Sequence, residues 1–240
     1  PGQLRAYAIY RTLSCRDMAR PQPPQQPPPV QKLRLRHVKR GTARFASHRD
    51  FGRALERALR RAGIPMAYSS GFSPHPRVSY AGAAPTGAAS EAEYVELGLS
   101  ERCDPEKVRE ALNRVLPPGF DVVTIVEAGG RPLHELLEAS WWTIELPGVD
   151  PAVLAQLAGI LRDAEQVEVT RMTKKGERRF DVRAGLIKVW ASENGLELVV
   201  RHSEPLVRPD DVVAALRLLV PDVLSEIDAR DLNERASVAP

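Results

Sequence analysis

The residues best suited to chemistry form a basic segment that begins at His48. At 100° per residue, Phe51 and Leu55 fall on one apolar stripe of a predicted helix, and three arginines point to the opposite side. These are Arg49, Arg53 and Arg60, with Arg57 next to them and Arg61 on the flank. A guanidinium group donates paired hydrogen bonds that match a phosphate, so the pattern predicts a phosphate-binding face. The alternative is an ordinary solvated surface.

A second candidate segment, residues 68–77, combines aromatic, hydroxyl, imidazole and guanidinium groups with glycine and proline. Loops of this kind place backbone N–H groups and side chains within reach of phosphates and bases. An aromatic ring here is suited to stacking on an unpaired base. The residues predicted to contact RNA are Tyr68, Ser69, Gly71, Phe72, His75 and Arg77. The alternative is a structural turn shaped by its glycine and prolines.

The five histidines and two cysteines are not spaced as a metal site requires. The sequence also has no phosphate-binding glycine loop, no nucleophile elbow and no cysteine triplet for a radical SAM cluster. We therefore predict no catalytic residue, no metal and no cofactor. Ser47 and His48 join the predicted RNA-binding set, although a histidine at a helix start is also a common structural residue and a possible general base.

Charge is divided unevenly along the chain. Residues 1–80 hold 16 lysines and arginines against three acidic residues, and residues 81–240 hold 18 against 28. This pattern predicts a surface for a polyanion in the first third, although solvated charges can also cluster by chance. The basic run 174–179 reads as a hairpin tip, either solvated or a further phosphate contact.

The elements that must position these residues follow a repeated order. Strand-like alternation begins at Lys32, continues through Arg44–Ala46, and leads to a helix that Ser47 and Asp50 cap at its start. The remaining elements expected in this half are strands at 77–80, 93–99 and 120–126 and a helix at 105–116. Strand, helix, strand, strand, helix, strand is the ferredoxin-like split βαβ order.

The same order recurs after residue 139. We expect strands at 141–146, 167–173, 180–190, 196–202 and 223–229, and helices at 151–164 and 209–219. The predicted fold class is therefore α+β, with two tandem ferredoxin-like halves at 32–128 and 129–240. Residues 1–31 are rich in proline and glutamine and are expected to be disordered. No apolar run is long enough to span a membrane and no signal peptide is recognised, so we expect a cytoplasmic protein.

From Lys32 onward the sequence resembles the bacterial radical SAM-linked family. The resemblance rests on four strings: Arg44-Phe45-Ala46-Ser47-His48-Arg49-Asp50; Arg57-Ala58-Leu59-Arg60-Arg61-Ala62-Gly63-Ile64-Pro65; Tyr68-Ser69-Ser70-Gly71-Phe72-Ser73-Pro74-His75-Pro76; and Ser90-Glu91-Ala92-Glu93-Tyr94. Arg49 and Ser73 stand where family members usually carry leucine and asparagine. Members are fused to, or encoded beside, a cobalamin-type radical SAM protein, often near genes for ribosomal proteins. The resemblance implies a radical SAM partner and a role in RNA or ribosome modification.

Three functions remain open at this point. The first is an accessory module that binds structured RNA or the ribosome beside a separate radical SAM protein, without contact with a membrane. The second is a metal-independent endoribonuclease that uses His48 or His75 as the base. The third is an adaptor that binds only protein. For the first function, we expect the start of the basic helix and the 69–77 loop to converge in one cleft that holds His48, Arg53, Arg57, Phe72, His75 and Arg77.

Overall fold

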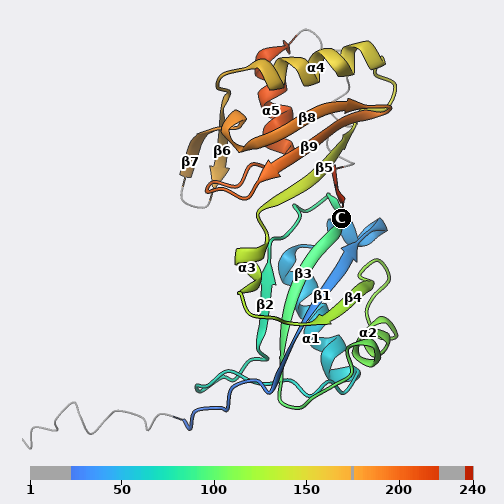
Figure 1. Cartoon of the computed structure of the whole chain (residues 1–240), viewed down its shortest axis with the longest axis vertical. Helices are drawn as coiled ribbons and strands as arrows, with labels where there is room; N and C mark the ends of the chain where they lie inside the picture. Colours follow the sequence, from blue (N-terminus) through green and yellow to red (C-terminus); the bar gives the residue numbers. More distant parts are fainter. Residues whose placement is uncertain (1–22, 174–175, 222–235, 240) are drawn as a thin grey trace, which may run out of the picture.

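The computed structural model describes residues 23–173, 176–221 and 236–239, and within them the chain is an α+β structure with antiparallel sheets (Figure 1). The first half contains β1 (Gln31–Lys39), the 3₁₀ helix η2 (Gly41–Phe45), α1 (His48–Arg61), β2 (Val78–Ala81), β3 (Ala89–Leu99), α2 (Pro105–Asn113) and β4 (Val122–Glu127). A connection with the short helix α3 (Leu133–Leu136) then leads to the second half.

The second half repeats this arrangement with one addition. It contains β5 (Ala139–Glu145), α4 (Pro151–Asp163), β6 (Glu168–Thr173), β7 (Gly176–Asp181), the 3₁₀ helix η3 (Arg183–Gly185), β8 (Leu186–Ser192), β9 (Gly195–Arg201), α5 (Pro209–Leu219) and β10 (Ala236–Ala239). β6 and β7 pair only with each other and form a separate hairpin. The pairing of these two strands agrees with the prediction that the basic run 174–179 belongs to a hairpin.

One large sheet joins the two halves. Its strands lie in the order β4-β1-β3-β10-β5-β9-β8, and β2 also pairs with β3. The described pairs are antiparallel except that between β10 and β3, which is parallel. β10 therefore links the edge of one half to the edge of the other through backbone hydrogen bonds.

Each half has its own hydrophobic core on one face of the sheet. In the first half, Leu33 and Leu35 of β1 pack with Leu55 of α1 and Leu112 of α2. Alternate residues of a strand point to opposite faces, so Lys32 and Arg34 lie on the other face. In the second half, the leucines of α4 pack against β9 and α5. α1 and the outward side chains of β1 are thus on opposite sides of the sheet.

Local sequence signals explain the start and end of α1. The Ser47 hydroxyl accepts a hydrogen bond from the Asp50 N–H, and the Asp50 carboxylate accepts one from the Ser47 N–H, which confirms the predicted capping box. The helix ends at Arg61, and Gly63 follows with a φ of 66°, a conformation that glycine adopts without strain. The predicted start of this helix at His48 is confirmed.

Two predicted strands are wrong. Residues 44–46 do not continue β1: the chain turns at Gly41, where φ is 54°, and forms η2, while the Arg40 N–H bonds to the Gly119 carbonyl. Residues 180–190 are not one strand, because η3 interrupts them between β7 and β8. The predicted strand at 223–229 and the predicted disorder of residues 1–22 lie outside the described residues.

The described part of the segment before β1 follows the first half closely. The Val30 N–H donates to the Leu99 carbonyl at 2.8 Å. The Gln26 N–H donates to the Ser70 hydroxyl at 2.9 Å. A Cβ atom placed on Gly98 would lie 2.9 Å from the Pro29 ring, so glycine at position 98 allows this close approach.

Candidate nucleic-acid interface

The outward side of α1 presents arginines that form no ion pair with an acidic residue in the described part of the chain. The helix buries Phe51, Ala54, Leu55, Ala58 and Leu59 and leaves five arginines exposed: Arg49, Arg53, Arg57, Arg60 and Arg61. None of the five forms an ion pair with a residue that the structure describes; Arg60 donates only to the Glu56 carbonyl of its own helix, at 3.4 Å. We call this set the α1 arginine face.

The acidic residue at the start of α1 is engaged in the cap. The Ser47 hydroxyl donates to the Asp50 carboxylate at 2.6 Å, and the hydrogen bonds from Ser47 lower the Asp50 pKa below its ordinary value. Ser47 is therefore a structural cap residue. The charges of Arg53 and Arg49 act on the same carboxylate from a distance, without forming an ion pair.

His48 lies at the start of α1 beside β2. Its ring meets the Tyr80 ring edge-on, with 4.7 Å between centroids. The Tyr80 hydroxyl belongs to a ring that is half buried, and burial raises the pKa of this phenol to about 12. The contact gives His48 a packing role, and no carboxylate of the described residues forms an ion pair with it.

The 68–77 loop closes on itself as a short hairpin. The Ser69 N–H donates to the His75 carbonyl at 2.8 Å, and the His75 N–H donates to the Ser69 hydroxyl at 3.0 Å. The Arg77 guanidinium donates to the Tyr68 carbonyl at 3.0 Å. Phe72 lies at the tip with 67% of its surface exposed. The loop thus presents an aromatic ring to solvent, and the hydrogen bonds of Ser69 and Arg77 stabilise the base of the loop.

Gly71 and His75 complete the predicted loop set. Gly71 has a φ of 125°, in the region that favours glycine, so this position shapes the tip. The His75 side chain is exposed and makes no hydrogen bond with the described residues. Gly71 thus has a backbone role in this loop, and the His75 ring is open to solvent.

The structure does not bring His48 and this loop into one cleft. The loop leaves the sheet before β2 begins, where the Ala67 N–H donates to the Gly98 carbonyl and the Gly98 N–H donates to the Arg77 carbonyl. His48 instead contacts Tyr80, near the far end of β2. The physical reason is the pairing of Tyr68 with Pro76, which closes the loop before it can fold back along α1. The expected shared cleft is absent among the described residues.

Three buried titratable side chains lie next to His48, around the same small hollow. They are His37, Lys39 and Glu93, and no pattern in the sequence singled them out. His37 is 2% exposed and stacks on Phe51 with 4.0 Å between ring centroids. Burial lowers its pKa to about 4 and outweighs the hydrogen bond to the Val38 carbonyl. His37 is therefore neutral at neutral pH. The strand alternation grouped His37 with Leu33 and Leu35, which are also buried, but it did not indicate the stacking on Phe51.

Lys39 and Glu93 share this buried region. The Lys39 ammonium donates to the carbonyls of Pro85 at 3.1 Å and Ala84 at 3.4 Å, and burial lowers its pKa. The Glu93 carboxylate accepts the Ala84 N–H at 3.1 Å. The hollow that they line has a volume of about 10 Å³, room for about one water molecule. This cluster anchors the segment before β3 and leaves no space for a substrate.

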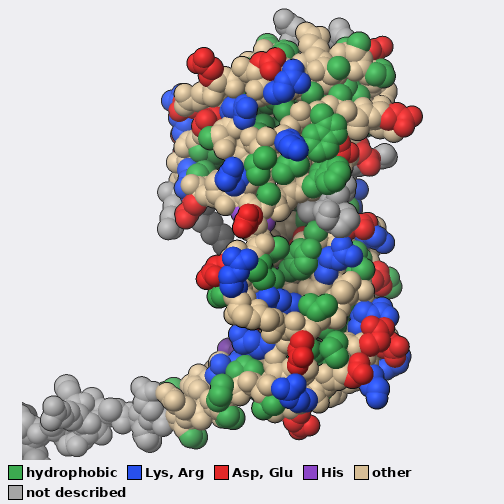
Figure 2. Space-filling model, in the orientation of Figure 1, with side chains coloured by type: hydrophobic (Ala, Val, Ile, Leu, Met, Phe, Trp, Pro, Cys, Tyr) green, Lys and Arg blue, Asp and Glu red, His purple; other side chains and the backbone are tan. Residues whose placement is uncertain are grey.

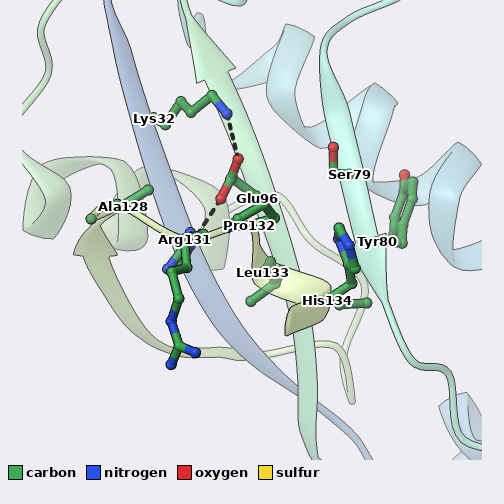
Figure 3. Close-up of a pocket in the computed structure, with 13 residues that line it drawn as sticks. Lys32, Ser79, Tyr80, Glu96, Ala128, Arg131, Pro132, Leu133 and His134 are labelled. Carbon is green, nitrogen blue, oxygen red and sulfur yellow. Dashed lines mark hydrogen bonds and ion pairs between the residues drawn. The ribbon is translucent and has the colours of Figure 1, made fainter. Parts of the chain in front are cut away.

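A larger hollow of about 520 Å³ lies on the other face of the sheet (Figure 3). The Glu96 carboxylate stands at its floor and forms ion pairs of 2.9 Å with Lys32 and with Arg34. Burial raises the Glu96 pKa, but the two cations outweigh this effect and hold the pKa below its ordinary value. The lining residues are Lys32, Arg34, Ser79, Tyr80, Ala81, Glu96, Ala128, Gly129, Gly130, Arg131, Pro132, Leu133 and His134.

The connection between the halves forms the wall of this larger hollow. The Ala128 N–H donates to the Lys32 carbonyl at 2.8 Å, and the Arg34 guanidinium donates to the Arg131 carbonyl. These bonds hold residues 128–134 over the open face of β1 and β3. The sequence predicted only a boundary between the two halves after residue 128, because nothing local indicates that the next residues cross the sheet.

The charged surface of the view in Figure 2 is mixed, with acidic side chains gathered over α2 and basic ones distributed across both halves. In the same orientation α1 lies behind β1 and β3 (Figure 1). Within the described residues, no group of three or more histidine, cysteine, aspartate or glutamate side chains is placed to hold a metal ion. None of the described helices combines the length and apolar character that crossing a bilayer requires.

Comparison with known families assigns most of the folded chain. Residues 32–209 match the model of a family described as "Uncharacterized protein conserved in bacteria (DUF2344)". The chain belongs to this family. The DUF2344 match starts at the second residue of β1 and ends at the first residue of α5, so it includes the α1 arginine face, the 68–77 loop and both hollows. No curated protein matches the chain.

Proposed function

We propose that this chain is an accessory module that binds structured RNA, alone or within the ribosome, through the α1 arginine face. The observation that carries the proposal is the five exposed arginines that have no acidic partner among the described residues. Like charges at i, i+4 cost an isolated helix a few tenths of a kcal/mol. A polyanion removes that cost and accepts the paired hydrogen bonds of each guanidinium group.

The 68–77 loop supplies a second, separate contact in this proposal. Phe72 is exposed at the loop tip, and the hydrogen bonds of Ser69 and Arg77 hold the loop behind it. An aromatic ring stacks on an unpaired base, at about 1–3 kcal/mol per base, and has no such site on a paired duplex. We therefore expect the loop to contact single-stranded parts of an RNA that α1 holds by its backbone.

The proposed partner is a separate radical SAM enzyme in the cytoplasm that modifies RNA or the ribosome. The resemblance to the radical SAM-linked family supports this partner, and the chain itself carries no cysteine triplet for an iron–sulfur cluster. In this proposal the chain recognises the RNA, and the separate radical SAM enzyme carries out the modification.

We further propose that each half is a ferredoxin-like unit. The order β4-β1-β3-β2 in the first half and β10-β5-β9-β8 in the second, with antiparallel neighbours, supports this classification. In such a unit the helices cover one face of the sheet and leave the other open. The β6–β7 hairpin is then an insertion between α4 and β8.

A salt titration of RNA binding tests the α1 arginine face. Changing Arg53, Arg57 and Arg60 together to glutamine should reduce the slope of log affinity against log salt by roughly two to three units, since each phosphate contact contributes about 0.7–0.9. The matched control changes Arg102, Arg109 and Arg114, which lie near or on α2, to glutamine. An unchanged slope in the α1 variant would remove the helix from the interface.

The same preparation separates the alternatives. Cleavage of the RNA by the purified chain, lost in His48→Ala or His75→Ala, would support an endoribonuclease. The geometry favours that function less, because His48 packs on Tyr80 and is not placed with His75. A complete lack of RNA affinity would support an adaptor that binds only protein.

A further inference from the structure

The larger hollow between the sheet and the 128–134 connection has the size and charge of a ligand site. Its volume of about 520 Å³ lies within the range of small-molecule sites, about 300–1,000 Å³. We propose that this hollow binds a nucleoside phosphate. The site goes beyond the RNA-binding face of α1, because β1 directs Lys32 and Arg34 away from the core that α1 covers.

The charges of the lining match a phosphate monoester. Lys32, Arg34 and Arg131 are cations, and Glu96 is the one carboxylate among the lining residues. Glu96 is 8% exposed and bonds to both Lys32 and Arg34, so it holds these two cations side by side at the floor of the hollow. Three positive charges and one negative charge suit a dianion, because ammonium and guanidinium groups donate charge-assisted hydrogen bonds to phosphate oxygens.

The backbone of the connection adds uncharged donors. The N–H groups of Gly129, Gly130 and Arg131 donate to no described residue. Gly129 and Gly130 have no side chain that could keep a ligand away from their N–H groups. The space beside both residues is open, because a Cβ atom at either position would meet no atom within 4 Å. Gly130 has a φ of 37°, in the left-handed region where glycine is favoured. Glycine-containing turns of this kind bring backbone N–H groups close to phosphate oxygens.

The rim of the hollow suits a base and a sugar. Pro132 supplies exposed apolar surface, and the His134 ring, 78% exposed in its side chain, stands near it (Figure 3). Imidazole rings stack on nucleobases as other aromatic side chains do. The Ser79 hydroxyl is exposed on the opposite wall and can bond to a ribose hydroxyl. The lining therefore offers a place for each part of a nucleotide.

Calorimetric titration of the full chain with adenosine monophosphate tests the site, with adenosine and inorganic phosphate as comparison ligands. We expect adenosine monophosphate to bind more tightly than either. Arg131→Gln and Lys32→Gln should each weaken its binding about tenfold, the effect of one charge-assisted hydrogen bond. Both variants should fold: the Arg131 side chain is exposed and only its carbonyl is used, and Arg34 still neutralises Glu96. Arg162→Gln, on α4, is the matched control and should leave binding unchanged.

Competition with short RNAs identifies the source of the nucleotide. If an RNA with a 5′ or 3′ phosphate displaces adenosine monophosphate and its unphosphorylated form does not, the hollow receives an RNA end. If neither displaces it, the ligand is a free nucleotide. No binding of adenosine monophosphate to the folded chain, or equal binding by inorganic phosphate or by both variants, would overturn the proposal. The α1 arginine face has its own variants and its own salt titration, so either proposal can fail alone.

Discussion

The helices α1 and α4 occupy corresponding places in the two halves but present different surfaces. Each follows the first strand of its half, and each buries leucines that are 0% exposed, Leu55 in α1 and Leu157 in α4. The outward positions of α1 carry five arginines, whereas those of α4 carry Ala152, Ala155, Gln156 and one arginine. That arginine, Arg162, is paired with Asp163 at 3.0 Å.

This difference separates what folding requires from what it does not. Both helices need a buried stripe and a capped start, and α4 meets both needs with an outer face that is nearly uncharged. Nothing in the described packing of α1 requires its arginines, so the proposed binding role and the folding role of this helix can be tested separately. Four predictions test this separation, from the largest expected effect to the smallest.

The buried stripes should be equally important in the two helices. Leu55→Ala and Leu157→Ala should each lower the free energy of unfolding by about 2–5 kcal/mol, because each removes buried methyl groups and leaves a cavity. Denaturant unfolding measures this change. Leu218→Ala, at a position that is 64% exposed, is the control and should change stability by less than about 0.5 kcal/mol. If Leu55→Ala left stability unchanged while Leu157→Ala lowered it, the two buried stripes would not be equivalent.

Of the helices that the structure describes, only α1 covers a buried histidine, so acid should destabilise the protein through His37. Its pKa is about 4 in the folded chain and 6.5 as the ordinary value. Between these values the unfolded chain binds a proton that the folded chain does not, so stability present above pH 6.5 is lost as the pH falls towards 4. The total loss is about 3 kcal/mol.

His37→Gln should remove this dependence and flatten the curve of stability against pH between 6.5 and 4. His134→Gln, at an exposed position, should leave the curve unchanged. If His37→Gln and the parent protein lose stability in parallel, burial of His37 does not control acid sensitivity.

Local signals in the sequence account for the elements that were predicted well. The Ser47–Asp50 capping box and the proline that begins α5 at Pro209 are patterns of adjacent residues, and both helices lie where these patterns predict. The arginine face of α1 follows from the same helical period. In α1, the sequence therefore predicts both the start of the helix and the side on which the arginines lie.

The hollows and the loop placement depend on contacts between distant residues. The 128–134 connection crosses the sheet because Arg34 and Lys32 bond to its backbone, and no short pattern encodes this. The alternation of β1 identified a strand without showing that Lys39 would be buried beneath the segment before β3. The 68–77 loop was expected to reach His48, but its own backbone pairing at Ser69 and His75 closes it first.

The capping residues of α1 and α4 should contribute about equally to the free energy of unfolding, although their caps differ. Ser47 caps α1 with a reciprocal box, and Asp150 caps α4 by accepting the Ala152 N–H at 2.7 Å. Ser47→Ala and Asp150→Ala should each cost about 1 kcal/mol, because each leaves a helix N–H without its acceptor. Thermal unfolding measures both. RNA affinity should stay unchanged in Ser47→Ala if the hydroxyl serves only the helix, and a loss of affinity in a folded variant would place Ser47 in the interface.

Single arginine substitutions on the two outer faces should give the smallest change in stability and the clearest separation of binding from folding. Arg57 and Arg162 are both exposed, so changing either to glutamine should alter the free energy of unfolding by less than about 0.5 kcal/mol. Arg57→Gln should nevertheless weaken RNA binding about fivefold at about 0.1 M salt, because one phosphate contact is lost, and Arg162→Gln should not. Equal RNA affinities in the two variants would mean that the arginines of α1 are no more than a solvated surface.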